Sequence, residues 1–357
     1  MSPDTRPERV VIKIGTSSLI SAGLPDPVKL TALADAVVRL RAEGRQPVLV
    51  ASGAIAAGEA RLARAGRRPA KAVRQAAAAV GQGLLFDAFR RAFDERGLIA
   101  AQVLLTPPDL TGATHRESTY TVLDGALDAG LVPLVNENDT VMVRNNDVLA
   151  ALVAAVLRAG RLVLLTDVPG VYDGDPRVHP AARLIPEIKV MTTDLERPAG
   201  GSGDGPGTGG MAAKLCAAWI GTMAGVTTVI AGADTPDAVV RAVAEDGIGT
   251  VIHPRVPSPA LDPARLWAAL SEPPAGRLVC GPGVLRALDE ARPLTGRHVR
   301  SVSGPFAAGS VVDIVTEDRV VARGRVLVGH DLCTSGDGSK DAPLLIHPTR
   351  YVSLLEA

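Results

Sequence analysis

The sequence predicts an α/β protein with a mostly parallel sheet, followed by a smaller β-rich module. Between residues 10 and 252, short runs of Val, Ile and Leu alternate with longer amphipathic or alanine-rich segments, as in strands joined by helices. The chain is 46% hydrophobic but only 3% aromatic, which is typical of an aliphatic α/β core. Beyond residue 276 the pattern changes to short valine-rich runs.

The elements of the first domain are expected in alternating order along the chain. Each strand is a short apolar run, and each helix is rich in alanine or has apolar residues at helical spacing. Strands are expected at residues 10–14, 47–51, 101–105, 131–135, 161–166, 226–231 and 249–252, and helices at 27–43, 71–96, 115–130, 148–158, 211–224 and 236–245.

A proline-rich stretch is expected to separate two domains. Residues 271–276 read SEPPAG, so we expect a first domain at 1–270, a linker at 271–276 and a β-rich domain at 277–357. The strands of the second domain are expected at 277–280, 299–303, 310–315, 320–328 and 344–347.

Charge and composition exclude several classes of protein. The 38 basic and 38 acidic side chains cancel, which argues against a general attraction to nucleic acid or to anionic membranes. The three cysteines are far apart and fit a reducing compartment. The first residues form no apolar signal core, and no apolar run approaches the length of a membrane span. We therefore expect a cytoplasmic protein.

Standard nucleotide and metal motifs are absent from the sequence. The pattern G-x-x-x-x-G-K-[ST] does not occur, and neither does H-E-x-x-H. Gly205, Gly207 and Gly210 match G-x-G-x-x-G, but a polar stretch precedes them where the dinucleotide motif requires a strand. Any nucleotide site is therefore of another type.

The densest glycine run lies at residues 200–214, GGSGDGPGTGGMAAK. It is either a flexible linker or a loop whose amides approach an anion, and this stretch alone favours neither. The expected helix at Met211 would direct free N–H groups and the positive end of its dipole to that loop. Lys214, one turn into the helix, would add a full positive charge.

Lys13 interrupts the apolar run at residues 10–14 and is followed by Gly15. It could be an edge-strand lysine whose stem extends into solvent. The alternative, which we favour, places it at the carboxyl end of a central strand, where open α/β sheets bind their ligands.

Polar residues also follow two other strands. Ser52 and Gly53 come after the second strand, and Asn136 to Asp139 follow the strand at 131–135. Asn146 and Asp147 open the next helix. Helix caps and Asx turns explain each group separately. Two such clusters around one short loop favour a pocket for a polar ligand, such as a small zwitterion.

Seven ordered motifs resemble those of the amino acid kinase family, and specifically of bacterial glutamate 5-kinases. Over about residues 9–255 they read V-V-I-K-I-G-T-S, A-S-G-A-I-A-A-G, V-N-E-N-D, N-N-D, L-L-T-D, Y-D-G-D-P and G-T-G-G-M-A-A-K. The resemblance implies a three-layer sandwich with a mostly parallel central sheet, and it favours a nucleotide loop for the glycine run. Residues 277–357 resemble the PUA domain that many of these kinases carry.

The resemblance also implies roles for individual residues. The catalytic residues would be Lys13, Lys214 and Asp147, with both lysines on ATP phosphates and Asp147 organising them. The other nucleotide contacts would come from Gly15, Thr166, Asp167, Thr208, Gly209, Gly210, Met211, Ala212 and Ala213. The amino acid would be held by Ser52, Gly53, Asn136, Asp139 and Asn146. No metal-ligating side chains are expected.

By resemblance, the reaction is ATP-dependent phosphorylation of the γ-carboxylate of L-glutamate, the first step of proline biosynthesis, with Mg²⁺ as cofactor. Feedback inhibition by proline, a homodimer or homotetramer, and functional coupling to glutamate-5-semialdehyde dehydrogenase are expected on the same basis.

Two alternatives stay open. The first is a kinase that acts on another small acid. It stays open because the family usually has Gly-Asp where this chain has Arg144 and Asn145, and a longer loop before that pair. The second is an RNA-associated protein that uses the PUA-like module. The ten basic and nine acidic residues at 277–357 nearly cancel, which argues against an RNA-binding surface.

Overall fold

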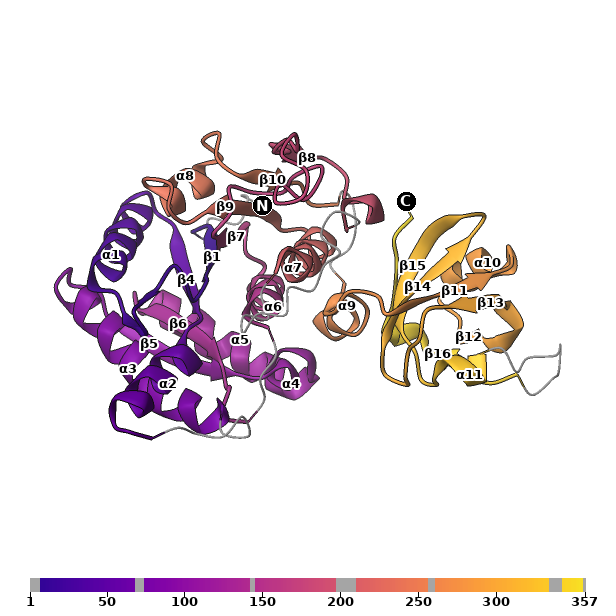
Figure 1. The fold of residues 1–357 in the computed structure, drawn as a ribbon, viewed down its shortest axis with the longest axis horizontal. Helices are drawn as coiled ribbons and strands as arrows, with labels where there is room; N and C mark the ends of the chain where they lie inside the picture. Colours follow the sequence, from indigo (N-terminus) through magenta and orange to yellow (C-terminus); the bar gives the residue numbers. More distant parts are fainter. Residues whose placement is uncertain are drawn as a thin grey trace, which may run out of the picture. The chain divides into compact units, whose positions relative to one another are not determined.

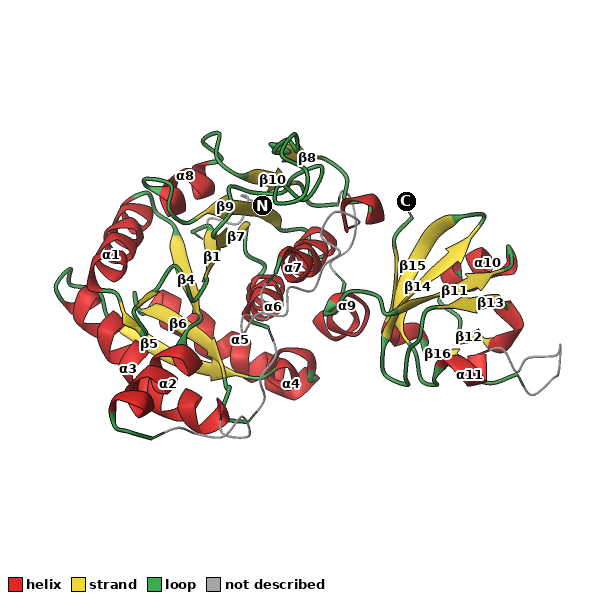
Figure 2. Cartoon of the chain, in the orientation of Figure 1, coloured by secondary structure: helices red, strands yellow, loops and turns green. Residues whose placement is uncertain are grey.

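The computed structural model describes residues 7–67, 74–141, 145–196, 210–255, 261–333 and 342–355. The chain divides into two compact units, Met1–Ala260 and Leu261–Ala357. Figure 1 follows the chain through both units, and Figure 2 marks their helices and strands. None of the described helices combines the length and the apolar character needed to cross a membrane.

The first unit is built on an eight-stranded sheet in the order β5-β6-β4-β1-β7-β9-β10-β8. Neighbouring strands from β5 to β9 are parallel, and β10 is antiparallel to β9. The strands are β1 (Arg9–Ile14), β4 (Gln46–Ala51), β5 (Ala100–Leu105), β6 (Val132–Glu137), β7 (Arg161–Thr166), β8 (Glu187–Ile188), β9 (Thr227–Gly232) and β10 (Thr250–Ile252). The prediction of a mostly parallel sheet is confirmed.

Helices cover both faces of this sheet. In Figure 1, α1, α3 and α8 lie on one face and α5, α6 and α7 on the other, which gives three layers. The helices are α1 (Pro27–Ala42), α2 (Ala54–Arg64), α3 (Arg74–Asp94), α4 (Pro107–Thr111), α5 (Ala113–Asp128), α6 (Asn146–Leu157), α7 (Met211–Met223) and α8 (Ala238–Ala244), with a short hairpin of β2 (Ile20–Ser21) and β3 (Leu24–Pro25) and a 3₁₀ turn η2 (Thr193–Glu196). The expected elements between residues 10 and 252 are all present, and their described ends differ from expectation by no more than two residues. Residues 71–73, where the helix at 71–96 was expected to begin, lie outside the described residues.

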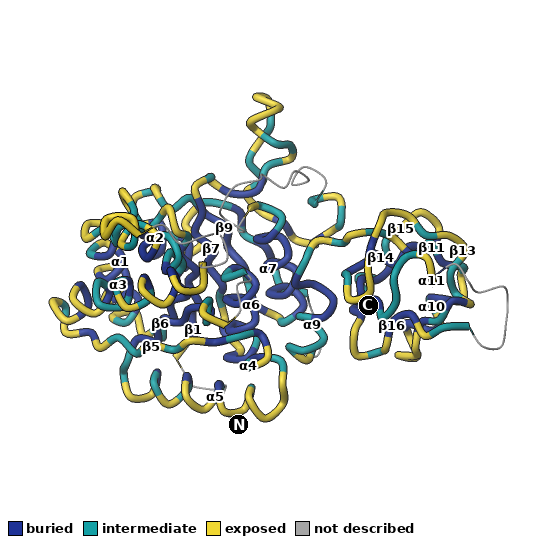
Figure 3. The backbone as a smooth tube through the Cα atoms, turned by 60° about the horizontal axis from the view of Figure 1, so that its bottom comes forward, coloured by how far each residue is buried: buried dark blue, intermediate teal, exposed yellow. Residues whose placement is uncertain are grey.

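The alternation of side chains along β1 decides which layer Lys13 faces. Val10, Ile12 and Ile14 belong to the core formed with α1, α3 and α8. Because successive strand residues point to opposite faces, Lys13 points to the layer of α6 and α7. These two helices are almost entirely buried, as their dark colour in Figure 3 indicates. Lys13 is therefore a buried lysine on a central strand rather than an edge-strand lysine.

The second unit contains a five-stranded sheet in the order β13-β11-β14-β15-β17. Its strands are β11 (Gly276–Cys280), β13 (Val299–Ser303), β14 (Val311–Thr316), β15 (Arg319–Arg325) and β17 (Tyr351–Ser353), and a separate pair joins β12 (Leu294–Thr295) to β16 (Leu344–Ile346). The remaining elements are α9 (Pro263–Leu270), α10 (Gly283–Asp289), α11 (His330–Cys333) and the 3₁₀ turns η3 (Gly296–His298) and η4 (Pro348–Arg350). A separate β-rich C-terminal part, as predicted, is therefore present.

Helix α9 was not predicted, and it packs with the second unit although its residues fall within the expected first domain. Arg265 Nε donates to the carbonyl of Tyr351 at 2.6 Å, and Arg325 Nε donates to that of Ala268 at 3.1 Å. The Arg325 guanidinium also lies over the Trp267 ring. The unit accordingly begins at Leu261, ten residues before the expected linker.

Two glycines allow α2 and α3 to pack in unusually close contact. A Cβ atom added at Gly81 would lie 1.8 Å from the carbonyl oxygen of Ala54, and one at Gly58 would lie 1.8 Å from that of Ala77. Backbone cannot yield as a flexible side chain can, so only glycine fits at either position. This contact sets the position of α3 relative to the start of α2.

We expect Gly81→Ala to destabilise the protein by ~1–3 kcal/mol, because its methyl group would overlap backbone and force the helices apart. The matched control is Gly83→Ala on the same helix, where an added Cβ meets nothing within 4 Å. That change should instead stabilise by about 1 kcal/mol, since alanine is the better helix former. Thermal unfolding of the two variants tests the contact, and equal midpoints would contradict it.

Candidate active site

The polar residues singled out in the sequence gather at one edge of the first unit's sheet. Strands β1, β4, β6 and β7 are parallel, so their carboxyl ends meet at this edge. In the sheet register, Lys13 lies beside Val50 of β4 and Leu164 of β7. Ser52 follows β4 directly, and Asn136 is the next-to-last residue of β6. Open α/β sheets bind ligands at such an edge.

The centre of the edge is a buried carboxylate shared by two lysines. Asp147, on the first turn of α6, has a side chain with no exposed surface. Its Oδ1 lies 2.8 Å from Lys13 Nζ and its Oδ2 lies 3.5 Å from Lys214 Nζ, and both lysine side chains are 6% exposed. Both contacts are ion pairs. Two positive charges thus share one negative charge.

The two lysines reach Asp147 from different layers of the fold. Lys13 comes from the sheet and Lys214 from the first turns of α7, while Asp147 lies on α6 between them. Asn145 caps α6, because its side-chain oxygen accepts the Asp147 N–H at 2.8 Å. An acidic residue in the first turn also suits the positive end of the helix dipole.

The balance of charges acts on Lys214. Burial lowers its pKa, and the charge of Lys13 lowers it as well, whereas Asp147 and Asp167 raise it. A buried ammonium of this kind gains from an additional anion, because the anion offsets lost hydration and the repulsion between lysines. The site is therefore poised to accept negative charge.

The start of α7 supplies backbone donors beside Lys214. The helix begins at Met211 with Gly210 at its N-cap, and the amides of Met211 and Ala212 lie in its first turn, where N–H groups have no partner within the helix. Ala213 follows and is buried. Thr208 and Gly209, with the glycines before them, lie outside the described residues.

The other expected nucleotide residues also lie at this edge. Thr166 ends β7 and is buried, and its hydroxyl donates to the carboxylate of the exposed Asp167 at 3.0 Å. Gly15 follows β1, and a Cβ added there would lie 4.0 Å from Lys13 Nζ. Gly15 therefore lies directly beside the lysine.

A hydrogen-bonded network of amides lies beside the ion pairs. The Glu137 N–H donates to the side-chain oxygens of Asn136, at 2.9 Å, and of Asn146, at 3.2 Å. Asn146 Nδ2 donates to Asn136 Oδ1 at 3.0 Å and to Ser52 Oγ at 3.1 Å. Asn136 Nδ2 donates to Gln82 Oε1 at 2.8 Å. The network joins residues of α3, β6 and α6 to Ser52, which follows β4.

Gly53 allows Ser52 to reach this network. Its φ of 111° is in the region that favours glycine, and an added Cβ would lie 2.9 Å from the Ile20 side chain. The chain therefore turns sharply from β4 into α2, leaving Ser52 at the sheet edge.

Asp139 differs from the other acidic residues of the site. It lies two residues after β6 and is half-buried. Burial raises its pKa to about 6, and the nearby charge of Arg74 opposes part of that rise. A half-buried carboxylate with a raised pKa is stabilised when a cation, such as an ammonium group, binds beside it.

Sequence reasoning missed two members of the site. Gln82 lies in the alanine-rich pattern of α3, and nothing in its spacing distinguishes it from a solvated helix residue. The Glu137 N–H is a backbone group, and the strand that presents it was expected to end at residue 135. Only the fold brings them together.

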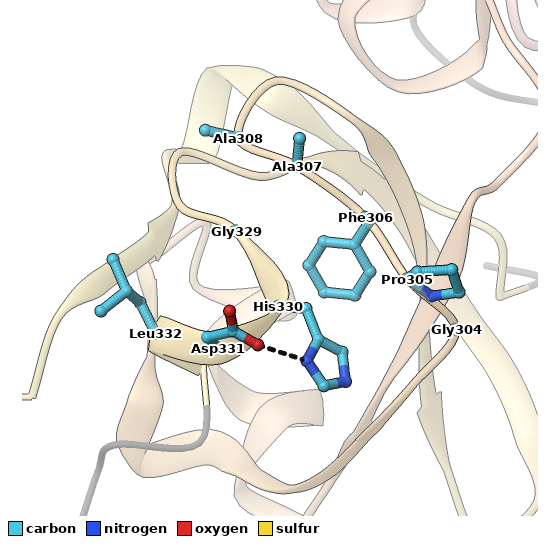
Figure 4. Close-up of a pocket in the computed structure, with 9 residues that line it drawn as sticks. All are labelled: Gly304, Pro305, Phe306, Ala307, Ala308, Gly329, His330, Asp331 and Leu332. Atoms are coloured by element: carbon cyan, nitrogen blue, oxygen red, sulfur yellow. Dashed lines mark hydrogen bonds and ion pairs between the residues drawn. The ribbon is translucent and has the colours of Figure 1, made fainter.

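A hollow in the second unit is unsuited to phosphate chemistry. It has a volume of about 710 Å³ and is lined by residues that include Gly304, Phe306, Ala307, Ala308, His330 and Asp331 (Figure 4). Among the described residues that line it, His330 and Asp331 alone are ionisable, and their side chains are 3.2 Å apart. The buried lysines at the sheet edge make that edge the candidate active site.

We expect Asp139→Asn to stabilise the unliganded protein above pH 6 and to leave it unchanged below about pH 4. The native carboxyl holds its proton up to pH about 6, whereas in the unfolded chain the value is near 3.8. Stability is therefore lost as the pH rises between these values, and asparagine avoids the loss.

Urea unfolding of both proteins from pH 4 to 7.5 measures this difference. Asp234→Asn, at an exposed aspartate of the same unit, is the control. A stabilising effect of Asp139→Asn that grows toward low pH would contradict the assigned burial.

Comparisons with known proteins place the chain in one family. A model of the amino acid kinase family matches residues 8–232. The glutamate 5-kinase of Salinispora arenicola is 44% identical over 340 residues, 92% of this chain and 89% of that protein. Glutamate 5-kinase 2 of Bacillus subtilis is 37% identical over 322 residues, 88% and 86% of the two chains.

A solved structure agrees with these matches at the level of the fold. Carbamate kinase from Giardia lamblia, bound to AMP-PNP, has a TM-score of 0.52 at 17% identity and covers 70% of this chain and 99% of its own. The family match runs from β1 through β9, so it includes the sheet edge that carries Lys13, Asp147 and Lys214. This chain belongs to the amino acid kinase family.

Proposed function

We propose that this protein transfers the γ-phosphoryl group of ATP to the γ-carboxylate of L-glutamate, forming L-glutamyl 5-phosphate. The observation that carries the proposal is the pair of buried lysines on the Asp147 carboxylate, beside a network of amides. Relatives named glutamate 5-kinase, which match about nine-tenths of this chain, support L-glutamate as the acceptor.

The residues present suit a carboxylate acceptor. Such a group has a pKa near ~4.3 and is ionised at neutral pH, so the nucleophile needs no general base. The difficulty lies in bringing two anions together and in stabilising the transferring phosphoryl group. Lys13 and Lys214 supply positive charge from the sheet and from α7, and Asp147 holds both ammonium groups in place.

The nucleotide and the amino acid have separate places in this proposal. The start of α7, with Gly210 to Ala213, and the end of β7, with Thr166 and Asp167, form the nucleotide side. Thr208 and Gly209 complete it by resemblance. The amino acid side is formed by Ser52, Gly53, Asn136, Asp139 and Asn146. Asp139 suits the ammonium group of the substrate.

Mg²⁺ is proposed to enter with ATP as part of the substrate. Among the described residues, no three His, Cys, Asp or Glu side chains are grouped so that they could hold a metal ion. Mg²⁺ is commonly bound through substrate phosphates with few protein ligands, so this arrangement fits MgATP.

The two units are proposed to be a catalytic domain and a PUA-like domain. The sheet edge that carries the lysines lies wholly within the first unit. The β-rich sheet of the second unit supports the PUA-like assignment, with α9 as its first element.

The proposal is tested by trapping the acyl phosphate with hydroxylamine in the presence of MgATP. We expect product from L-glutamate and none from L-aspartate, N-acetyl-L-glutamate or carbamate. Product from another acceptor alone would identify that acceptor as the substrate in place of L-glutamate. Product from no acceptor would overturn the proposed function.

We further expect Lys214→Ala to lower kcat by ~100-fold or more while changing the KM for ATP much less, because the lost charge acts mainly on the transition state. The exposed Lys189→Ala is the matched control and should leave both constants unchanged. A rise in KM at constant kcat would instead make Lys214 a ground-state binding residue.

A further inference from the structure

Gln82 contacts the amide network at one point, where its side-chain oxygen accepts a hydrogen bond from the buried Asn136 amide. We propose that Gln82 is a positioning residue for the amino acid acceptor: by accepting from the Asn136 amide it holds that side chain in place, and through it supports Asn146 and Ser52. The proposal rests on the proposed function, because it concerns the acceptor side of the same site.

The orientation of each amide follows from a single backbone group. The Glu137 N–H can only donate, so the oxygens of Asn136 and Asn146 must point toward it. Asn136 then directs its NH₂ group to Gln82, which must present its oxygen. Asn146 likewise directs its NH₂ group to Asn136 and Ser52.

This directionality has a chemical consequence at Ser52. The Ser52 oxygen accepts a hydrogen bond from Asn146, so its own hydrogen remains to be donated. No described residue accepts that hydrogen. A hydroxyl with a proton to donate suits an acceptor-only group such as a carboxylate. The network therefore offers a hydrogen-bond donor to a carboxylate bound at the sheet edge.

Gln82 is the end of the network that can be changed without touching the substrate. Asn136 is 1% exposed, so its NH₂ group finds no solvent if Gln82 is lost. An unpaired buried donor is costly, and the Asn136 side chain would be expected to turn away or to flip. The adjacent Gly81, in contact with the Ala54 carbonyl, fixes where Gln82 lies.

The test is a double-mutant cycle of Gln82→Met and Asn136→Ala in the full chain. Gln82→Met keeps the length of the side chain and removes its amide. It should raise the KM for L-glutamate about tenfold and leave the KM for ATP within about twofold. Gln46→Met, at the opposite edge of the sheet, is the matched control and should change neither.

The cycle separates positioning from direct binding. If Gln82 acts through Asn136, the double variant is no weaker for L-glutamate than Asn136→Ala alone. A double variant about tenfold weaker than Asn136→Ala would place Gln82 on the substrate itself and overturn the proposal, as would an unchanged KM in Gln82→Met.

A second measurement serves if Asn136→Ala does not fold. In protein labelled with ¹⁵N-asparagine, Gln82→Met should shift two side-chain amide resonances, those of Asn136 and Asn146, and Gln46→Met should shift none. Unchanged resonances in Gln82→Met would overturn the proposal.

Failure of the proposed function gives a different result. If the wild-type protein forms no product but binds L-glutamate in a calorimeter, only the proposed reaction is overturned. A Kd for L-glutamate about tenfold weaker in Gln82→Met would then support the positioning role. An equal Kd overturns that role, and no binding to the wild type overturns both.

Discussion

The ion pairs of Asp147 with Lys13 and Lys214 are the constraint on which the site depends. Each charge is almost fully removed from water, which is unfavourable for an isolated ion. The carboxylate offsets part of that cost for both lysines and reduces their mutual repulsion. It also ties α6 to the sheet and to α7, so one side chain sets the spacing of three elements. Removing it would leave two buried cations facing each other.

The charge that remains explains why this edge suits phosphoryl transfer. Two ammonium groups and one carboxylate leave a positive excess where burial weakens screening. Burial lowers the pKa of Lys214, which means that it disfavours the charged ammonium form. A phosphate dianion bound beside the lysine would stabilise that charged form again. The positive groups are in place before any ligand arrives, and such preorganisation is the main way in which enzymes stabilise transferring phosphoryl groups.

The sequence predicted the fold and the charged half of the site better than its polar half. Lys13 was recognisable because a lysine is unusual in an apolar strand. The alternation of strands and helices along the sequence predicted the parallel sheet. Gln82 carried no such signal, since glutamine is ordinary on an alanine-rich helix. The contact of Gly81 with α2 and the packing of α9 on β15 depend on residues distant in sequence, which local pattern cannot reveal.

The two halves of the site differ in how they achieve selectivity. The lysines attract any anion, so charge alone would not distinguish one small acid from another. The amide network instead has a fixed direction, imposed by the Glu137 N–H, and presents a hydroxyl donor at Ser52. Reversing any amide would bring donors face to face. In the proposed function, the directed amide network thus contributes to discrimination among acceptors, while the buried lysines stabilise the charge of the transferring phosphoryl group.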